Sequence, residues 1–388
     1  MRLSPADARE AAEIVRAANA PFDIVGGGTR GFGRPPEGEA RLSSAGFSGV
    51  IFHEPAEMTL SARAGTPIRE VEEKLAAAGQ MLPFEPMDPR MLFGTQGEPT
   101  VGGLVASALA GPRRLSAGAV RDNVLGVEIV NGRGEIIRAG GRVMKNVTGL
   151  DLVKITCGAL GTLGFVTEAT FKLLPRPRAQ ATVVIRRLDD AQAVQAMARA
   201  LGSPFGVSGA ATIHAGMGRE FPRTLLRVEG FEDSVAYRAE RLIALLADFG
   251  AKHALQGEDS ERMWRAIRDG AFLAEPRERA IWRASLKPSD APAALAALGT
   301  NVHDSLMDLG GGLVWFSTDP TQQAARQVRA ALARFPGHAE LIRADAGLRS
   351  QVDVFTPLTP ALARLTLGVK QSLDPKGLFN PGRMYASA

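Results

Sequence analysis

The stretch FDIVGGGTRGFG, residues 22–33, decides how this chain folds. Its apolar start predicts a buried strand, and the glycines that follow predict a tight loop. Without Cβ atoms, successive backbone N–H groups can turn toward one anion, and a diphosphate can approach the main chain closely. The stretch therefore predicts a phosphate-binding loop.

The loop must be tested against the commonest nucleotide-binding fold. Gly26, Gly28 and Gly31 satisfy G-x-G-x-x-G, the fingerprint of nicotinamide-dinucleotide binding. That fingerprint requires a helix directly after the loop, because the helix N-terminus holds the pyrophosphate. Residues 34–38 read RPPEG, which cannot lie inside a helix. The Rossmann interpretation fails locally, and a phosphate-binding loop of another architecture remains.

Composition limits the class of protein. With 388 residues, 45% of them hydrophobic, the chain can bury a large core and is expected to form two domains. A net charge of +5, with no basic run that contains aromatic residues, argues against a nucleic-acid partner. Ser4 is expected to N-cap an amphipathic helix that reaches Asn19, which is not the pattern of a signal peptide. No apolar run approaches the ~20 residues of a membrane span, so we expect a cytoplasmic protein.

The sequence has few residues that could form disulfides or bind metal ions. Cys157 is the only cysteine, which excludes an internal disulfide, a cysteine-based zinc site and a self-contained iron–sulfur cluster. The five histidines are widely separated and lack the spacing of metal ligands. We therefore expect no metal site.

The rest of the chain shows where the domains divide. A long irregular stretch over 83–121 contains a second glycine-rich site, TVGGLVAS at 100–107. NGRG at 131–134 predicts a β-hairpin, and PRPR at 175–178 marks a boundary. Beyond that boundary, strand patterns alternate with amphipathic helices. The predicted class is α+β, with a first domain over 1–178, a second over 179–358, and a C-terminal segment, 359–388, that packs back on the first.

Five stretches together carry a family resemblance. They are VGGGT at 25–29, TLSARAG at 59–65, TVGG at 100–103, GTLGFVTE at 161–168 and NPGR at 380–383. In this order they resemble the FAD-binding domain of the vanillyl-alcohol-oxidase superfamily, also called PCMH-type. The resemblance implies a two-subdomain FAD-binding domain and a smaller α+β cap domain that contacts the substrate.

Three further stretches narrow the resemblance. KNVTGLDL at 145–152 is similar to the 2-hydroxyacid dehydrogenase branch of that superfamily. DLGGGLVW at 308–315 and the ending DPKGLFNPGRMY at 374–385 resemble the FAD-binding subunit of bacterial glycolate oxidases.

The resemblance implies roles for matching residues. Backbone N–H groups of the first loop would wrap the FAD diphosphate: Gly26, Gly27, Gly28, Thr29 and Arg30. The second loop would line the diphosphate and ribose: Thr100, Gly102, Gly103, Ala106 and Ser107. Asp88 and Gly94 would lie in a loop that approaches the flavin. The backbone of Val166 would bind the adenine, and Asn380 would lie near the isoalloxazine ring.

Two departures from the family pattern matter. Some relatives attach FAD covalently through a histidine in the first loop. Thr29 lies there in this chain, so we expect noncovalent FAD. Single-chain 2-hydroxyacid dehydrogenases of this branch carry H-x-G-D-G-N-x-H, which supplies metal ligands beside the flavin. This sequence has no such motif, and residues 308–315 stand at the corresponding position along the chain.

Oxidation of a 2-hydroxy acid also needs a cation for the carboxylate and a base for the hydroxyl proton. Arg265, Arg268 and Arg283 are candidate cations, and His214 and His303 are candidate bases. Ordinary ion pairing explains each of them at least as well. The sequence therefore assigns no catalytic residue.

The resemblance implies a complex with a second flavin subunit and an iron–sulfur subunit, associated peripherally with the inner membrane through those partners. Glycolate would be oxidised to glyoxylate, and electrons would pass through FAD to the partners. Two alternatives remain: a self-sufficient FAD-dependent dehydrogenase of another hydroxy acid or alcohol, and a non-catalytic FAD-binding scaffold subunit.

Overall fold

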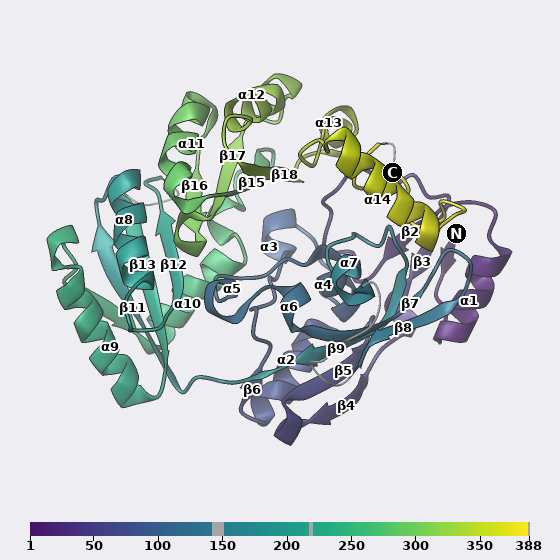
Figure 1. Ribbon diagram of the computed structural model, residues 1–388, viewed down its shortest axis with the longest axis horizontal. Helices are drawn as coiled ribbons and strands as arrows, with labels where there is room; N and C mark the ends of the chain where they lie inside the picture. Colours follow the sequence, from purple (N-terminus) through teal and green to yellow (C-terminus); the bar gives the residue numbers. More distant parts are fainter. Residues whose placement is uncertain (142–150, 217–219, 387–388) are drawn as a thin grey trace. The chain divides into compact units, whose positions relative to one another are not determined.

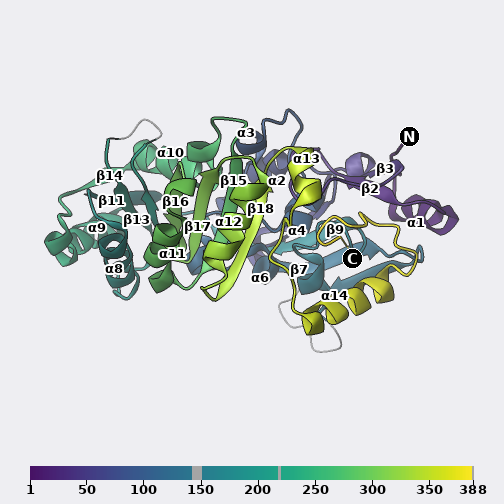
Figure 2. The same ribbon diagram turned by 90° about the horizontal axis from the view of Figure 1, so that it is seen from above.

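The computed structural model describes residues 1–141, 151–216 and 220–386. Figures 1 and 2 show its helices and strands from two directions. The chain divides into two compact units, which mix helices and strands as the predicted α+β class requires. Unit 1 contains residues 1–110, 118–176 and 357–388, and unit 2 contains residues 111–117 and 177–356.

Unit 1 contains a small parallel sheet in the order β1-β3-β2. Its strands are β1 (Arg2–Leu3), β3 (Ala40–Ser43) and β2 (Phe22–Val25). Helix α1 (Ala8–Ala17) follows β1, and its N-cap is Asp7, not Ser4 as the sequence predicted. The Asp7 carboxylate accepts hydrogen bonds from the N–H groups of Arg9 and Glu10, which Ser4 is too far along the chain to reach.

A larger antiparallel sheet in the same unit has the order β4-β5-β9-β7-β8. Its strands are β4 (Val50–Glu54), β5 (Thr59–Arg63), β9 (Phe165–Lys172), β7 (Val124–Val130) and β8 (Ile136–Gly140). Strands β7 and β8 flank the NGRG turn, which confirms the predicted hairpin. A two-stranded sheet pairs β6 (Gln80–Met81) with β10 (Leu174–Pro175).

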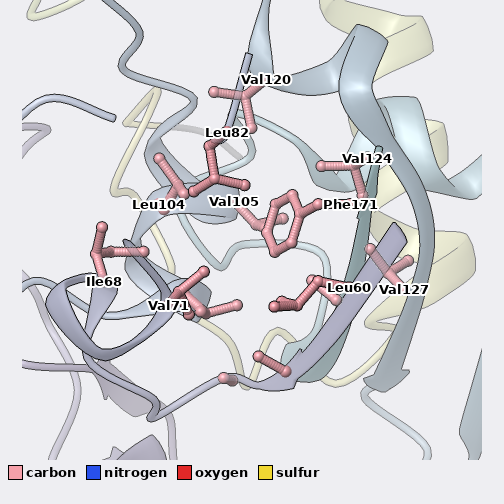
Figure 3. Close-up of a cluster of buried hydrophobic side chains, with 14 of the residues drawn as sticks. Leu60, Ile68, Val71, Leu82, Leu104, Val105, Val120, Val124, Val127 and Phe171 are labelled. Carbon is pink, nitrogen blue, oxygen red and sulfur yellow. The ribbon is translucent and has the colours of Figure 1, made fainter. Parts of the chain in front are cut away.

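The core of unit 1 lies against this five-stranded sheet (Figure 3). Phe171 of β9 is fully buried among side chains from several elements. Helix α2 (Ile68–Ala77) contributes Ile68, Val71 and Leu75, the apolar face that its sequence predicted. The other helices of unit 1 are α3 (Arg90–Phe93), α4 (Val101–Ser107), α6 (Val120–Asn123), α7 (Leu152–Thr156) and α14 (Pro360–Leu373).

Unit 2 is built on an eight-stranded antiparallel sheet in the order β14-β11-β13-β12-β16-β17-β15-β18. In chain order the strands are β11 (Ala179–Arg186), β12 (Val207–Ile213), β13 (Arg223–Gly230), β14 (His253–Gln256), β15 (Ala280–Leu286), β16 (Ser305–Asp308), β17 (Leu313–Thr318) and β18 (Gly337–Arg343). The helices are α5 (Arg114–Ala117), α8 (Asp190–Leu201), α9 (Glu232–Leu245), α10 (Gly257–Arg268), α11 (Ala291–Leu298), α12 (Gln322–Leu332) and α13 (Ala346–Gln351).

Within the described ranges, no helix has the length and apolar character needed to cross a membrane. The longest, α9 and α14, have 14 residues each.

A buried ion pair explains why residues 111–117 group with unit 2. Arg113 donates two hydrogen bonds to the Glu229 carboxylate, at 2.7 and 3.1 Å, and both side chains are largely shielded from solvent. Glu229 lies on β13 and also contacts Arg227, which is 1% exposed. A bidentate guanidinium–carboxylate pair in such surroundings holds its two segments in a fixed geometry.

We expect Arg113→Ala to lower the free energy of unfolding by about 2 kcal/mol, because it leaves a buried carboxylate with fewer donors. Urea denaturation measures this. The matched control is Arg114→Ala, since Arg114 is the exposed first residue of α5, next to Arg113 in the chain, and its loss should change little. Equal stability of the two variants would contradict the importance of the pair.

Candidate functional site

The two glycine-rich loops of the sequence lie in direct contact in unit 1. A Cβ atom on Gly27 would lie 1.6 Å from the Glu98 carbonyl oxygen, and a Cβ on Gly97 would lie 1.7 Å from the Gly27 oxygen. Backbone atoms at these distances cannot move aside as a flexible side chain can. Glycine is therefore required where the loop after β2 meets the loop before α4.

Thr100 links the same two loops through its side chain. Its hydroxyl N-caps α4 by accepting a hydrogen bond from the Gly103 N–H at 3.3 Å. A Cβ on Gly26 would lie 2.5 Å from that hydroxyl, and one on Gly102 would lie 2.9 Å from the Ala64 Cβ. Gly28 differs: it has a φ of +70° and open space around its Cβ position. Main chain at Gly28 is thus accessible to a ligand.

Arg30 places a cation beside these loops. Its Nη2 lies 3.5 Å from the Met87 carbonyl oxygen, and its Nε is buried with no hydrogen-bond partner. Burial lowers the pKa of the guanidinium to about 10, although nearby Asp88 opposes the shift. Arg30 stays charged at neutral pH. The preceding residue, Thr29, is buried.

Asp88 and Gly94 belong to the segment around α3. The Asp88 carboxylate accepts hydrogen bonds from Nε and Nη2 of Arg90, at 3.0 and 2.8 Å, and from the Arg90 N–H. Gly94 ends α3 with a φ of +67°, and its N–H donates to the Arg90 carbonyl oxygen. Both residues therefore shape this segment.

The C-terminal part of α4 is tied to the loop before β9. Ala106 accepts a hydrogen bond from the Leu160 N–H at 2.8 Å, and the buried Ser107 hydroxyl lies 3.4 Å from the Leu104 oxygen. Val166 pairs with Ile129 next to a β-bulge, and its side chain is in the core. Only the backbone of Val166 could contact a ligand.

Asn380 joins three segments. Its side-chain oxygen accepts from the Ile24 N–H at 2.8 Å, and its amide donates to the Leu160 oxygen at 2.7 Å. Its own N–H donates to the Phe22 oxygen at 3.1 Å. Asn380 thus holds β2, the strand that leads into the first glycine loop.

Sequence reasoning missed the ion pair that supports Asn380. The Lys370 ammonium is buried and donates to the Asp374 carboxylate at 2.7 Å, and to the Thr162 and Phe379 oxygens at 2.7 and 2.8 Å. Burial lowers the pKa of Lys370, and the pairing with Asp374 opposes the shift. The i, i+4 spacing of Lys370 and Asp374 was a signal for this pair.

The candidate substrate residues all lie beside acids. The pairs and their shortest distances are Arg265–Glu261 at 3.5 Å, Arg268–Asp269 at 2.7 Å, Arg283–Glu340 at 2.5 Å, His214–Asp190 at 2.7 Å and His303–Asp319 at 2.8 Å. Within the part of the chain that the structure describes, no group of three or more His, Cys, Asp or Glu side chains could hold a metal ion. Most of the 145–152 motif lies outside the described residues.

Comparison with known proteins agrees with this geometry. Residues 2–140 match the FAD binding domain family FAD_binding_4. The fold is shared with 4-ethylphenol oxidase from Gulosibacter chungangensis, at a TM-score of 0.71 and 14% identity over 100% of this chain and 89% of that one. An alkyldihydroxyacetonephosphate synthase has a TM-score of 0.72 and 16% identity, covering 98% of this chain and 75% of that one. The protein is an FAD-dependent oxidoreductase of the PCMH-type superfamily.

Its relatives define the family more closely. The chain is 38% identical to the glycolate oxidase subunit GlcE of Escherichia coli, over 94% of this chain and 93% of that protein. It is 31% identical to the glycolate oxidase subunit GlcD of Bacillus subtilis, over 39% of this chain and 30% of that protein. This chain belongs to the family of the glycolate oxidase subunit GlcE. The family resemblance and the FAD cofactor predicted from the sequence are confirmed.

The glycine contact provides a test of the FAD site. We expect Gly27→Ala to bind FAD at least 100-fold more weakly, because the new methyl group forces the two loops apart. Flavin absorbance per protein after gel filtration measures this. The control is Gly31→Ala, whose Cβ would make only an ordinary contact, 3.8 Å from the Phe93 ring. Full flavin content in Gly27→Ala would show that the loop contact is not needed.

Cys157 provides a test of burial near the same loops. Desolvation raises the pKa of its thiol to about 12, and Asp151 adds to the shift. Since the thiolate is the reactive form, iodoacetamide at about pH 8 should label the folded protein about 1000-fold more slowly than the urea-unfolded chain. Because the raised pKa keeps a proton that the unfolded chain loses, this group reduces stability as the pH rises above about 9. Equal labelling rates would show that the thiol is accessible.

Proposed function

We propose that this chain is the FAD-bearing subunit of a glycolate-oxidising complex, in which glycolate becomes glyoxylate and electrons leave through FAD to partner subunits. The observation that carries the proposal is the match to GlcE of Escherichia coli over nearly the full length of both proteins. The two joined glycine loops supply the cofactor site that this function needs.

FAD would be held by unit 1 without a covalent bond, since Thr29 lies where a linking histidine would be. Bound FAD supplies a hydride acceptor. The backbone of residues 26–30 would face the diphosphate, together with Thr100, Gly102 and Gly103. Ala106 and Ser107 would line the ribose side, and the Val166 backbone would face the adenine.

Asp88, Gly94 and Asn380 would act mainly by shaping the site. Both polar atoms of the Asn380 side chain are already engaged with backbone groups, so its part in flavin binding would be to fix β2 and the loop at Leu160. The Asp88 carboxylate is paired with Arg90, and this pairing would limit the negative charge of Asp88 near the flavin. Unit 2, with the cap-domain region 179–358 predicted from the sequence, would contact the substrate.

The route by which electrons would leave the flavin argues for partner subunits. An iron–sulfur cluster needs several thiolates, and the sequence has one cysteine. Two relatives, GlcE of Escherichia coli and GlcD of Bacillus subtilis, are subunits of glycolate oxidase. We therefore propose a second flavin subunit and an iron–sulfur subunit as partners, with peripheral attachment to the inner membrane through them.

A second candidate is a self-sufficient dehydrogenase of another hydroxy acid. The D-2-hydroxyglutarate dehydrogenase of Xanthomonas citri supports it, being 24% identical over 98% of this chain and 88% of that protein. The ion pairs at Arg265, Arg268 and Arg283 weigh against it, because a substrate carboxylate would have to displace an existing acid from an arginine.

Anaerobic flavin spectroscopy separates these candidates. Glycolate should leave the flavin of the isolated chain oxidised and should bleach it once the partner subunits are co-expressed and co-purified. The Gly27→Ala variant, carried through the same complex, controls for flavin held by the partners. Bleaching of the isolated chain by glycolate would show a complete active site here, and a colourless chain after FAD reconstitution would support the scaffold alternative.

A further inference from the structure

We infer that the Arg30 side chain, and not only its backbone, is a binding residue for the FAD diphosphate. This inference rests on the proposed function of unit 1 as the FAD-binding unit. The sequence resemblance implies that the loop backbone binds the diphosphate, but it assigns no role to the Arg30 guanidinium.

The guanidinium lies between the two glycine loops. Arg30 follows the glycines of the first loop directly, and its Nη1 lies 3.1 Å from the position that a Cβ on Gly103 would occupy. Gly103 belongs to α4 and is capped by Thr100. A side chain at residue 103 would crowd the guanidinium, so glycine there leaves room for the cation as well as for a ligand.

Protein groups leave this cation without a full set of partners. Among the described residues, Arg30 has no carboxylate within ion-pair distance, its Nε has no acceptor, and its one hydrogen bond reaches the Met87 oxygen at 3.5 Å. The sequence of the remaining residues, 142–150, 217–219 and 387–388, contains no Asp or Glu side chain. A half-buried cation whose Nε is shielded from water and has no acceptor is costly, and an anion from a ligand would reduce that cost.

The neighbouring charges are compatible with a bound diphosphate. Asp88 is the acid that acts on Arg30, and it shares its carboxylate with Arg90. Glu98 also contacts Arg90, at 3.2 Å, and is partly exposed to solvent. Arg90 carries one positive charge against these two acids, so the four side chains together are neutral, and Arg30 is the cation among them that has no carboxylate within ion-pair distance. The diphosphate is the permanent anion of FAD, and a planar guanidinium fork suits phosphate oxygens.

The experiment compares Arg30→Gln and Arg30→Lys with a matched control, Arg41→Gln. Arg41 lies on β3 of the same small sheet with a side chain 68% exposed, so its loss removes the same charge from a solvated position. Dissociation constants of the apoprotein are measured for FAD, and for ADP, which has a diphosphate but no flavin ring.

We expect Arg30→Gln to raise the dissociation constants for FAD and for ADP by about 10- to 100-fold each. The constants of Arg30→Lys should lie between those of the wild type and of Arg30→Gln, and those of Arg41→Gln should change little. Weaker FAD binding with unchanged ADP binding would overturn the inference and place Arg30 at the flavin ring. Unchanged binding of both would overturn it as well.

Apoprotein stability separates binding from a structural role. Arg30→Gln removes a poorly partnered buried charge, so the apoprotein should melt no lower than the wild type, while the stabilisation gained on adding FAD should shrink. Equal destabilisation of the apo and FAD-bound forms would mean that Arg30 is only structural. If Arg30→Gln does not fold, the FAD and ADP affinities of Arg30→Lys test the inference instead. Glycolate turnover enters none of these measurements, so failure of the glycolate proposal would leave this test intact.

Discussion

The side-chain amide of Asn380 is the contact that holds together the segments around the first glycine loop. It accepts from the Ile24 N–H and donates to the Leu160 oxygen, and so joins strand β2 to the loop before β9 from positions 356 and 220 residues further along the chain. An amide offers a donor and an acceptor on two separate atoms of one short side chain. The backbone of Asn380 has a φ of +42°, a conformation that Asn tolerates better than most residues. The hydrogen bonds and the backbone geometry at this position thus favour the same residue.

Asn380 is itself held by the buried pair of Lys370 and Asp374. The two Asp374 oxygens accept from the N–H groups of Leu378 and Phe379, and Lys370 donates to the Phe379 oxygen. Every charge in this pair is met by hydrogen bonds, which offsets the cost of burying it. A hydrophobic pair could fill the same volume but would not fix the direction of the backbone that delivers Asn380. The pair therefore contributes geometry more than net stability.

Local features of this fold were predictable from the sequence, and long-range features were not. The glycine loops, the 131–134 hairpin and the buried face of α2 each follow from residues close together in the chain. The contact between Gly27 and Glu98, the two bonds of the Asn380 side chain and the grouping of 111–117 with unit 2 join residues far apart. No periodicity or turn signal reports such contacts. The N-cap of α1 was misplaced because Ser4 and Asp7 both satisfy the local rule, and packing selected Asp7.

The pairing of arginines differs between the two units of this chain. In unit 1 a half-buried arginine, Arg30, lacks a close carboxylate, whereas the candidate substrate arginines of unit 2 are each paired with an acid. A guanidinium that already shares its fork with a carboxylate must break that pair to bind another, while an unpaired one gains an interaction. Anion recognition by this chain is therefore strongest at the glycine loops.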